Sequence, residues 1–342
     1  MVGNFLWEYS QPQAQTITEN FVDEDKMNNV KQLLTKLFSE MGAEQSTIKS
    51  YDLSNKVVII TGSTDGIGKS LARIISSYNP KRLVLPVRNR EKGENLLEYI
   101  RNSQDGKVEC VELWDIDFAD LHSVKSFADK FIKEVGELHY LWNNAGIFNF
   151  SVKKTKDNFE QQFQVNFLSH FLLTTLLIPT MKSSATPESP CKINFTGSDN
   201  ENFGNIDLND LTGEKSSGSF KFQANSKLMD HVYSKELNRR LQGSNVISLI
   251  CLPGFVSTNA GDLPQYLLPL KRFAMAFGSS PDIGAINIMY PVLDATINDG
   301  GKSFRKCEEM NVTGQATDEE FAKKFWENCE VLLRNYDPNL LE

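Results

Sequence analysis

A short apolar run that leads straight into a glycine-rich turn constrains this chain more than any other feature. Val57–Ile60 has the composition of a buried strand, and residues 61–68 follow it with three glycines before a helix-like segment begins. Glycines in such a turn let the backbone approach a pyrophosphate, whose charge the helix N-terminus favours. Because a strand precedes the turn and a helix follows it, the sequence predicts a dinucleotide-binding site here. The candidate residues of this turn are Gly62, Ser63, Thr64, Gly66, Ile67 and Gly68.

Strand-like and helix-like segments alternate from residue 56 onward, as in a parallel sheet that is covered by helices on both faces. We therefore expect one α/β domain over residues 55–342, a doubly wound parallel sheet of the Rossmann type. The expected strands are 57–60, 83–87, 108–113, 140–142, 192–195 and 246–251. The expected helices are 70–77, 91–102, 121–134, 163–181 and 223–241. The polar run 199–219 is expected to form a long loop at one end of the sheet.

Residues 1–54 precede the first expected strand and are predicted to form an N-terminal helical extension. Between residues 19 and 42, apolar residues recur at helical spacing, which predicts one amphipathic helix. Five acidic residues outnumber three lysines in this stretch, whereas helices that lie on membrane surfaces are usually basic. We expect the helix to dock on protein; peripheral contact with an intracellular membrane is the disfavoured alternative.

Composition excludes several classes of function. The net charge of −8 disfavours a nucleic-acid partner or an anionic membrane surface. The five cysteines show no CxxC or Cys/His pairing, so neither a zinc site nor a disulfide framework is expected. The N-terminus lacks the basic and then apolar pattern of a signal peptide, and no apolar run approaches about 18 residues. We therefore expect a soluble cytoplasmic protein without a metal.

The residue that follows the second expected strand bears on the choice of cofactor. NAD-binding chains usually carry an acid there for the ribose hydroxyls, and this chain has Arg88. A guanidinium suits a ribose 2′-phosphate through charge-assisted hydrogen bonds, which favours NADP(H) over NAD(H). The alternative is a solvated arginine at a strand end, and the charge of Asp65 at the same corner opposes phosphate binding.

Two further motifs, taken with the glycine-rich turn, resemble the short-chain dehydrogenase/reductase family. They are Asn143-Asn144-Ala145-Gly146 and Pro253-Gly254, in that order and at suitable intervals. Residues 117–121, 165–174 and 318–326 are similar to the retinol dehydrogenase branch of this family. The resemblance covers about residues 55–335. It implies Asp117 beside the adenine, Asn144, Ala145 and Gly146 along the adenine ribose, and Pro253, Gly254 and Thr258 near the nicotinamide.

The same resemblance implies hydride transfer between a nicotinamide and a carbonyl or alcohol carbon, with a tyrosine hydroxyl exchanging the proton. Asn166, Ser198 and Lys227 match the asparagine, the serine and the lysine that assist this tyrosine. Gln223 stands four residues before Lys227, where the family places the tyrosine itself. Residues four apart share a helix face, so Gln223 is predicted to project into the site.

An amide donates hydrogen bonds but does not surrender a proton near neutral pH. Loss of a positioned general acid typically costs about 10²–10⁴-fold in rate. Two interpretations therefore stay open: an NADP-dependent oxidoreductase that Gln223 impairs, and a non-catalytic NADP(H)-binding sensor or scaffold. Tyr233 is predicted to face away from Lys227, and His170 and His231 to be structural.

The segment after Pro253-Gly254 is rich in apolar residues over about 259–280. The resemblance implies that this segment closes over the substrate as a lid, which favours a small apolar aldehyde, ketone or alcohol. A core helix or a lid that dips into a membrane explains the same residues. The resemblance also implies a dimer or a tetramer through the helices at 163–181 and 223–241, and we expect a homodimer.

Overall fold

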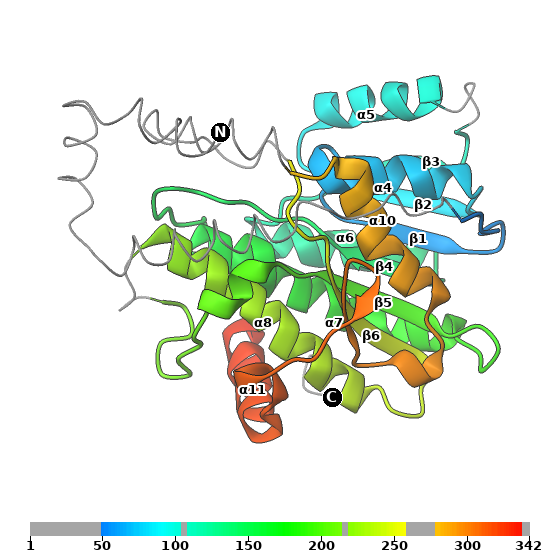
Figure 1. Ribbon diagram of the computed structural model, residues 1–342. Coiled ribbons are helices and arrows are strands. Elements are labelled where there is room, and N and C mark those ends of the chain that lie inside the picture. Colours follow the sequence, from blue (N-terminus) through cyan, green and yellow to red (C-terminus); the bar gives the residue numbers. More distant parts are fainter. Residues whose placement is uncertain (1–48, 104–107, 214–217, 258–277, 337–342) are drawn as a thin grey trace, which may run out of the picture. The chain divides into compact units, whose positions relative to one another are not determined.

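The computed structural model describes residues 49–103, 108–213, 218–257 and 278–336 (Figure 1). The predicted amphipathic helix at 19–42, Thr258 and most of the expected lid at 259–280 lie outside the described residues. Among the described residues, no helix combines the length and apolar character that crossing a membrane requires.

The described residues form one eight-stranded sheet with the order β3-β2-β1-β4-β5-β6-β7-β8. All neighbouring pairs are parallel except β7 and β8, which form an antiparallel hairpin. The strands are β1 (Val57–Ile60), β2 (Arg82–Val87), β3 (Val111–Asp115), β4 (Tyr140–Asn143), β5 (Cys191–Thr196), β6 (Val246–Leu252), β7 (Ser303–Arg305) and β8 (Glu308–Glu309). The predicted doubly wound parallel sheet is confirmed.

Helices cover both faces of this sheet (Figure 1). The α-helices are α4 (Gly66–Ser77), α5 (Arg90–Ser103), α6 (Leu121–Glu134), α7 (Ser169–Ser184), α8 (Ser219–Arg240), α10 (Pro281–Asp294) and α11 (Glu319–Leu333). A π-helical turn, η1 (Phe163–Leu168), leads into α7, and three 3-10 turns are η2 (Asp199–Phe203), η4 (Ile297–Asp299) and η5 (Gly314–Thr317).

The sheet separates two apolar cores. One core joins the sheet to α6, α7, α8 and α11, and the other joins it to α4, α5 and α10. Every residue of β1, β4, β5 and β6 is buried, because both sides of these central strands are covered. This double burial explains why the strands read as continuous apolar runs in the sequence.

The observed elements differ from the predicted ones at a few places. The third strand begins at Val111 and not at 108, because Val108 O accepts a hydrogen bond from Val111 N and so closes a turn over residues 109–110. The predicted helix at 163–181 starts as the π-helical turn η1. The polar run after β5 contains η2, and its last residue, Ser219, begins α8.

Candidate active site

The order of the strands places a topological switch point at the carboxyl end of β1. This strand lies between β2 and β4, so the connections that leave β1 and β4 run to opposite sides of the sheet. In doubly wound sheets, ligands bind outside the carboxyl ends of the strands at such a switch point. The helix α4 begins here, only six residues after the last residue of β1.

The glycine-rich turn is packed so closely that side chains would not fit. Gly62 and Gly66 have φ angles of +67° and +52°, which favour glycine. A Cβ atom at Gly62 would lie 2.6 Å from Ala145 Cα, and one at Gly68 would lie 2.1 Å from Gly62 O. The close approach of helix and turn at the switch point is what a dinucleotide site requires, so the residues present fit a nicotinamide dinucleotide.

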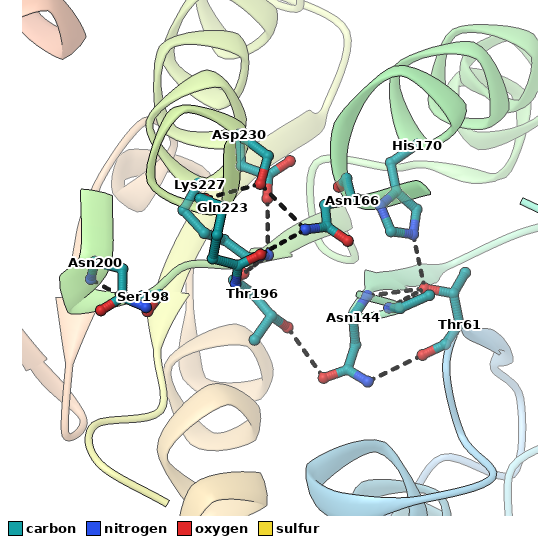
Figure 2. A network of polar contacts seen from close by, with 12 residues as sticks. Thr61, Asn144, Asn166, His170, Thr196, Ser198, Asn200, Gln223, Lys227 and Asp230 are labelled. Carbon is teal, nitrogen blue, oxygen red and sulfur yellow. Dashed lines mark hydrogen bonds and ion pairs between the residues drawn. The ribbon is translucent and has the colours of Figure 1, made fainter. Parts of the chain in front are cut away.

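Hydrogen bonds tie this turn to the loop that follows β4. Thr61 Oγ1 accepts from the backbone N–H groups of Asn144 and Ala145, each at 2.8 Å. Asn144 Nδ2 donates to Thr61 O at 3.1 Å, and its Oδ1 lies 3.4 Å from Thr196 Oγ1 (Figure 2). The residues predicted along the adenine ribose are thereby fixed between the ends of β1 and β5.

His170 completes this junction as a structural residue. Its Nδ1 lies 2.9 Å from Asn166 O and its Nε2 lies 3.0 Å from Thr61 Oγ1. Complete burial lowers the pKa of His170 to about 3, so the ring is neutral. Because a carbonyl only accepts, Nδ1 carries the proton and the Thr61 hydroxyl donates to Nε2. The predicted structural role of His170 agrees with these contacts.

Asn166 is the centre of a second group of polar contacts. It lies in η1, and π-helical turns occur frequently at functional sites. Its Nδ2 donates to Gln223 Oε1 at 2.8 Å and to Ser226 Oγ at 3.1 Å, and its Oδ1 accepts from Ile147 N at 2.8 Å. One amide thus joins η1, α8 and the loop after β4 (Figure 2).

Gln223 and Lys227 lie one helical turn apart on α8, as the sequence predicts. Lys227 Nζ donates to Thr196 O at 2.8 Å and to Asp230 Oδ2 at 3.0 Å. Burial raises the pKa of the Asp230 carboxyl to about 6, against the opposing effect of Lys227, and the nearby Glu201 charge raises it as well. Asp230 was not among the predicted site residues, although an acid three residues after Lys227 shares its helix face.

The Ser198 hydroxyl is not brought to this group. It caps η2 by accepting a hydrogen bond from Asn200 N at 3.2 Å, and it lies apart from Gln223 and Lys227 (Figure 2). The reason is local: β5 ends at Thr196, and the chain turns into η2 two residues later. The structure therefore gathers Asn166, Gln223 and Lys227 without the predicted serine.

The remaining predicted cofactor residues line the carboxyl ends of β2, β3 and β6. Arg88 is exposed directly after β2, and Asp117 Oδ1 accepts from Ala119 N at 2.9 Å. Asp65 caps α4 by accepting from Gly66 N at 2.7 Å, so a carboxylate stands at the helix N-terminus. Gly254 has a φ angle of +79°, and Pro253 O accepts from Asn287 Nδ2 at 2.9 Å.

Aromatic side chains gather around the N-terminus of α8. Phe220 contacts Phe203 with 5.8 Å between ring centroids, and Phe148 contacts Phe150 at 4.7 Å. The Ser219 hydroxyl donates to Asn149 O, which joins the two aromatic pairs to the same turn of α8. Phe220 precedes Gln223 by three residues on α8 and contacts Phe203. The pair Phe148–Phe150 is connected to this turn through Asn149.

Within the described residues, no three histidine, cysteine or acidic side chains are grouped as a metal site would need. The cysteines are free thiols; Cys191, Cys251 and Cys329 are buried, and Cys110 and Cys307 are half-buried. His231 binds Glu201 Oε1 at 2.9 Å and Ser303 Oγ at 2.7 Å, in agreement with its predicted structural role.

Comparisons with known proteins agree with this geometry. Residues 56–262 match the family described as short chain dehydrogenase. Human retinol dehydrogenase 14 is 33% identical over 297 residues, which cover 82% of this chain and 87% of that protein. An uncharacterised protein of Mycobacterium paratuberculosis has a similar crystal structure, with a TM-score of 0.66, 27% identity and coverage of 84% of this chain and 96% of that one. A Burkholderia cenocepacia short chain dehydrogenase in complex with NADP shares the fold, with a TM-score of 0.56, 18% identity and coverage of 74% and 96%.

Proposed function

The chain belongs to the short-chain dehydrogenase family, and from that premise we propose that it is an NADP-dependent oxidoreductase whose turnover is limited by Gln223. The observation that carries this proposal is the gathering of Asn166, Gln223 and Lys227 beside the end of β5 (Figure 2). Contacts run from Lys227 through Thr196 and Asn144 to Thr61, at the start of the glycine-rich turn. The proposed reaction residues are thereby connected to the proposed cofactor residues.

A bound nicotinamide supplies or accepts the hydride, and the protein handles the carbonyl oxygen and its proton. Gln223 Oε1 accepts a hydrogen bond from Asn166 Nδ2, so the Nε2 hydrogens of the same amide take no part in that contact. Those hydrogens can donate to a substrate oxygen and stabilise the charge that develops there. They cannot be given up as protons, so we expect hydride transfer to be slow and not absent.

The cofactor and substrate classes are part of the proposal. Arg88 is exposed at the end of β2, where its guanidinium can meet the 2′-phosphate of NADP(H). The aromatic pairs around the first turn of α8 support an apolar aldehyde, ketone or alcohol. The name of the human relative, retinol dehydrogenase 14, points to an apolar alcohol of the same kind. We place this activity in the cytoplasm, with contact to an intracellular membrane as the alternative.

The implied homodimer through α7 and α8 stays a proposal, and α11 of the same chain covers part of these two helices. Trp326 of α11 contacts Phe171 of α7 and Tyr233 of α8, with ring centroids 4.9 and 5.1 Å apart. Arg240 at the end of α8 lies over the same Trp326 ring at 4.3 Å. We propose that a homodimer through these helices would use the parts of α7 and α8 that α11 does not cover.

The experiment that tests the function is single-turnover oxidation of NADPH by the full-length protein with a panel of apolar aldehydes and ketones. The same measurement is made on Gln223→Tyr and Lys227→Ala. Turnover by the natural protein that is lost in Lys227→Ala supports the oxidoreductase. No acceleration by any compound, in the natural protein or in Gln223→Tyr, contradicts it.

A second candidate is a non-catalytic NADP(H)-binding sensor or scaffold. The observation that favours it is that Gln223 Oε1 and Lys227 Nζ already bind protein groups, Asn166 and Asp230. A ligand that binds only the folded state raises the melting temperature. The second candidate therefore predicts that NADPH raises the melting temperature while only Gln223→Tyr oxidises it.

A further inference from the structure

A buried ion pair lies one helical turn beyond Gln223 on α8. Lys227 Nζ is 3.0 Å from Asp230 Oδ2, and the two side chains are 9% and 3% exposed. The same ammonium donates to Thr196 O at the end of β5, so the pair is connected to the residues of the proposed cofactor site (Figure 2). The proposed function uses Lys227 and leaves Asp230 without a role.

The surroundings of Asp230 disfavour its negative charge. Its second oxygen, Oδ1, is buried and has no hydrogen-bond partner among the described residues, and Glu201 Oε2 is in the same condition. The charged groups that act on it are Lys227 from its own helix and Glu201 from η2. His231 binds the other oxygen of Glu201 at 2.9 Å and also contacts Ser303 of β7. A buried carboxylate with an unpaired oxygen is costly, which favours the protonated form.

Protonation of Asp230 changes the charge next to the proposed cofactor site. With Asp230 ionised, the pair is neutral, and a charge-assisted hydrogen bond holds the Lys227 ammonium. With Asp230 protonated, the pair carries one positive charge, and the ammonium is held by a weaker, neutral acceptor. A dinucleotide that carries phosphates is attracted more strongly by the second state, and little solvent is present to screen the difference.

Building on the proposed function, we propose that Asp230 is a positioning residue that controls how strongly Lys227 attracts the cofactor, so that the cofactor binds more tightly when Asp230 is protonated. Lys227 has three donor hydrogens, and Thr196 O and Asp230 Oδ2 account for two of them. These two hydrogen bonds fix the direction of the third N–H of the ammonium. In this way Asp230 positions Lys227. The gain in affinity comes from the charge that Asp230 no longer cancels.

The pH range of this effect follows from burial, which raises the pKa of Asp230 to about 6. Affinity is expected to rise as the pH falls through about 6. Linkage is reciprocal, so binding of the cofactor raises the pKa of Asp230 further, and the protein takes up a proton on binding. Proton uptake is a measure of this coupling that does not depend on turnover.

The test is calorimetric titration of the full-length protein with NADP⁺ from about pH 5 to about pH 8, in buffers of different ionisation enthalpy. The natural protein is expected to bind about tenfold more tightly at the acid end and to take up a fraction of a proton near neutral pH. Asp230→Asn is expected to lose that proton uptake and to lose the part of the affinity change that Asp230 causes. The 2′-phosphate of NADP⁺ also titrates, but it contributes equally to both proteins and cancels in the comparison.

Two further variants sharpen the test. Glu201→Gln removes the charge that raises the pKa of Asp230, so its binding transition is expected to move to lower pH. Glu236→Gln removes another buried acid of α8, which pairs with Arg239 and Arg240, and is expected to leave the transition in place. Identical proton uptake in the natural protein, Asp230→Asn and Glu201→Gln overturns the inference while the proposed cofactor stands. Absence of NADP⁺ and NADPH binding at every pH in every variant overturns the proposed function instead.

Discussion

Two carboxylates lie beside residues of the proposed site, Asp65 in the glycine-rich turn and Asp230 next to Lys227. Asp65 is held at the N-terminus of α4 by Gly66 N, and Asp230 is held behind Lys227. When ionised, each carboxylate opposes the binding of an anionic cofactor. The positions of Gln223 and Asn166 could be predicted from helix spacing and from the family motif. The roles of Asp230 and Ser198 could not be predicted, because the first depends on burial and the second, as the cap of η2, depends on where β5 ends.

The charge of Asp65 is predicted to weaken cofactor binding. Its carboxylate accepts from Gly66 N at 2.7 Å, at the helix end that favours an anion. Asp65→Asn keeps a capping acceptor and removes the charge, so NADPH affinity should rise by about three- to tenfold with a stability change below about 1 kcal/mol. Fluorescence titration at low and high salt measures this, and the gain should shrink at high salt. An unchanged affinity at low salt contradicts the prediction.

Lys227→Met is predicted to destabilise the protein in a pH-dependent manner. The pKa of Asp230 is about 6 in the folded protein and about 3.9 in an unfolded chain, so the folded state holds the proton more tightly. This contribution to stability is present below about pH 4 and is lost as the pH rises through about 6. Removing Lys227 raises the pKa of the carboxyl further, so the loss continues to higher pH.

Urea unfolding of Lys227→Met at about pH 5 and about pH 8 measures this effect. The expected loss of unfolding free energy is about 3–5 kcal/mol at the higher pH, where a buried carboxylate has no cation, and less at the lower pH. Lys235→Met is the matched control, because this lysine of the same helix donates to the Gly301 carbonyl and not to a carboxylate. Equal losses at both pH values would show that Asp230 stays ionised throughout.

Among the elements, strands β1 to β6 could be predicted from their apolar runs, and α4, α5 and α6 from their clear amphipathic periods. The helices α7 and α8 were also predicted, although both are buried on most sides. The helix α10 was not predicted, because a glycine and two prolines interrupt the helical pattern of this apolar segment. The hairpin β7–β8 escaped because its strands have only three and two residues. The π-helical form of η1 has no sequence period of its own, although it carries Asn166.

The helix α11 is predicted to be a main source of stability for the proposed reaction site. Trp326 packs against Phe171 and Tyr233, which also contact each other at 4.5 Å. Trp326→Ala should therefore lower the free energy of unfolding by about 3–5 kcal/mol. Val331→Ala on the same helix, at a position 56% exposed, should change it by less than about 0.5 kcal/mol. Denaturant unfolding of both variants makes the comparison, and similar values for the two would contradict the packing argument.

In the whole molecule, residues that precede the first strand already make long-range contacts with the compact domain. The sequence predicts the boundary at residue 54, where the apolar strand pattern begins. Leu53 is nevertheless buried in the core beneath α4 and α10, and Leu53 N donates to Tyr78 O. Tyr51 OH and Lys49 Nζ both donate to the Asp294 carboxylate at the end of α10. These long-range contacts have no signature in the local sequence.

Two truncations test this boundary. Removal of residues 1–47 leaves the contacts of Lys49, Tyr51 and Leu53 in place, whereas removal of residues 1–54 deletes them. The longer truncation should therefore be less stable than the shorter one by about 2–5 kcal/mol, mainly through loss of the buried Leu53. Thermal and urea unfolding of the two purified proteins measures the difference, and equal stabilities would place the boundary at residue 54.

Because the sheet divides the interior into two cores, the two sides of the proposed site can evolve separately. The glycine-rich turn leads into α4, which belongs to one core, while Asn166, Gln223 and Lys227 lie on elements of the other. Substitutions that reshape the reaction side therefore need not disturb the packing that shapes the nucleotide side. A substitution at position 223 can therefore alter the proposed reaction side while the packing of the proposed nucleotide side passes unchanged to descendants.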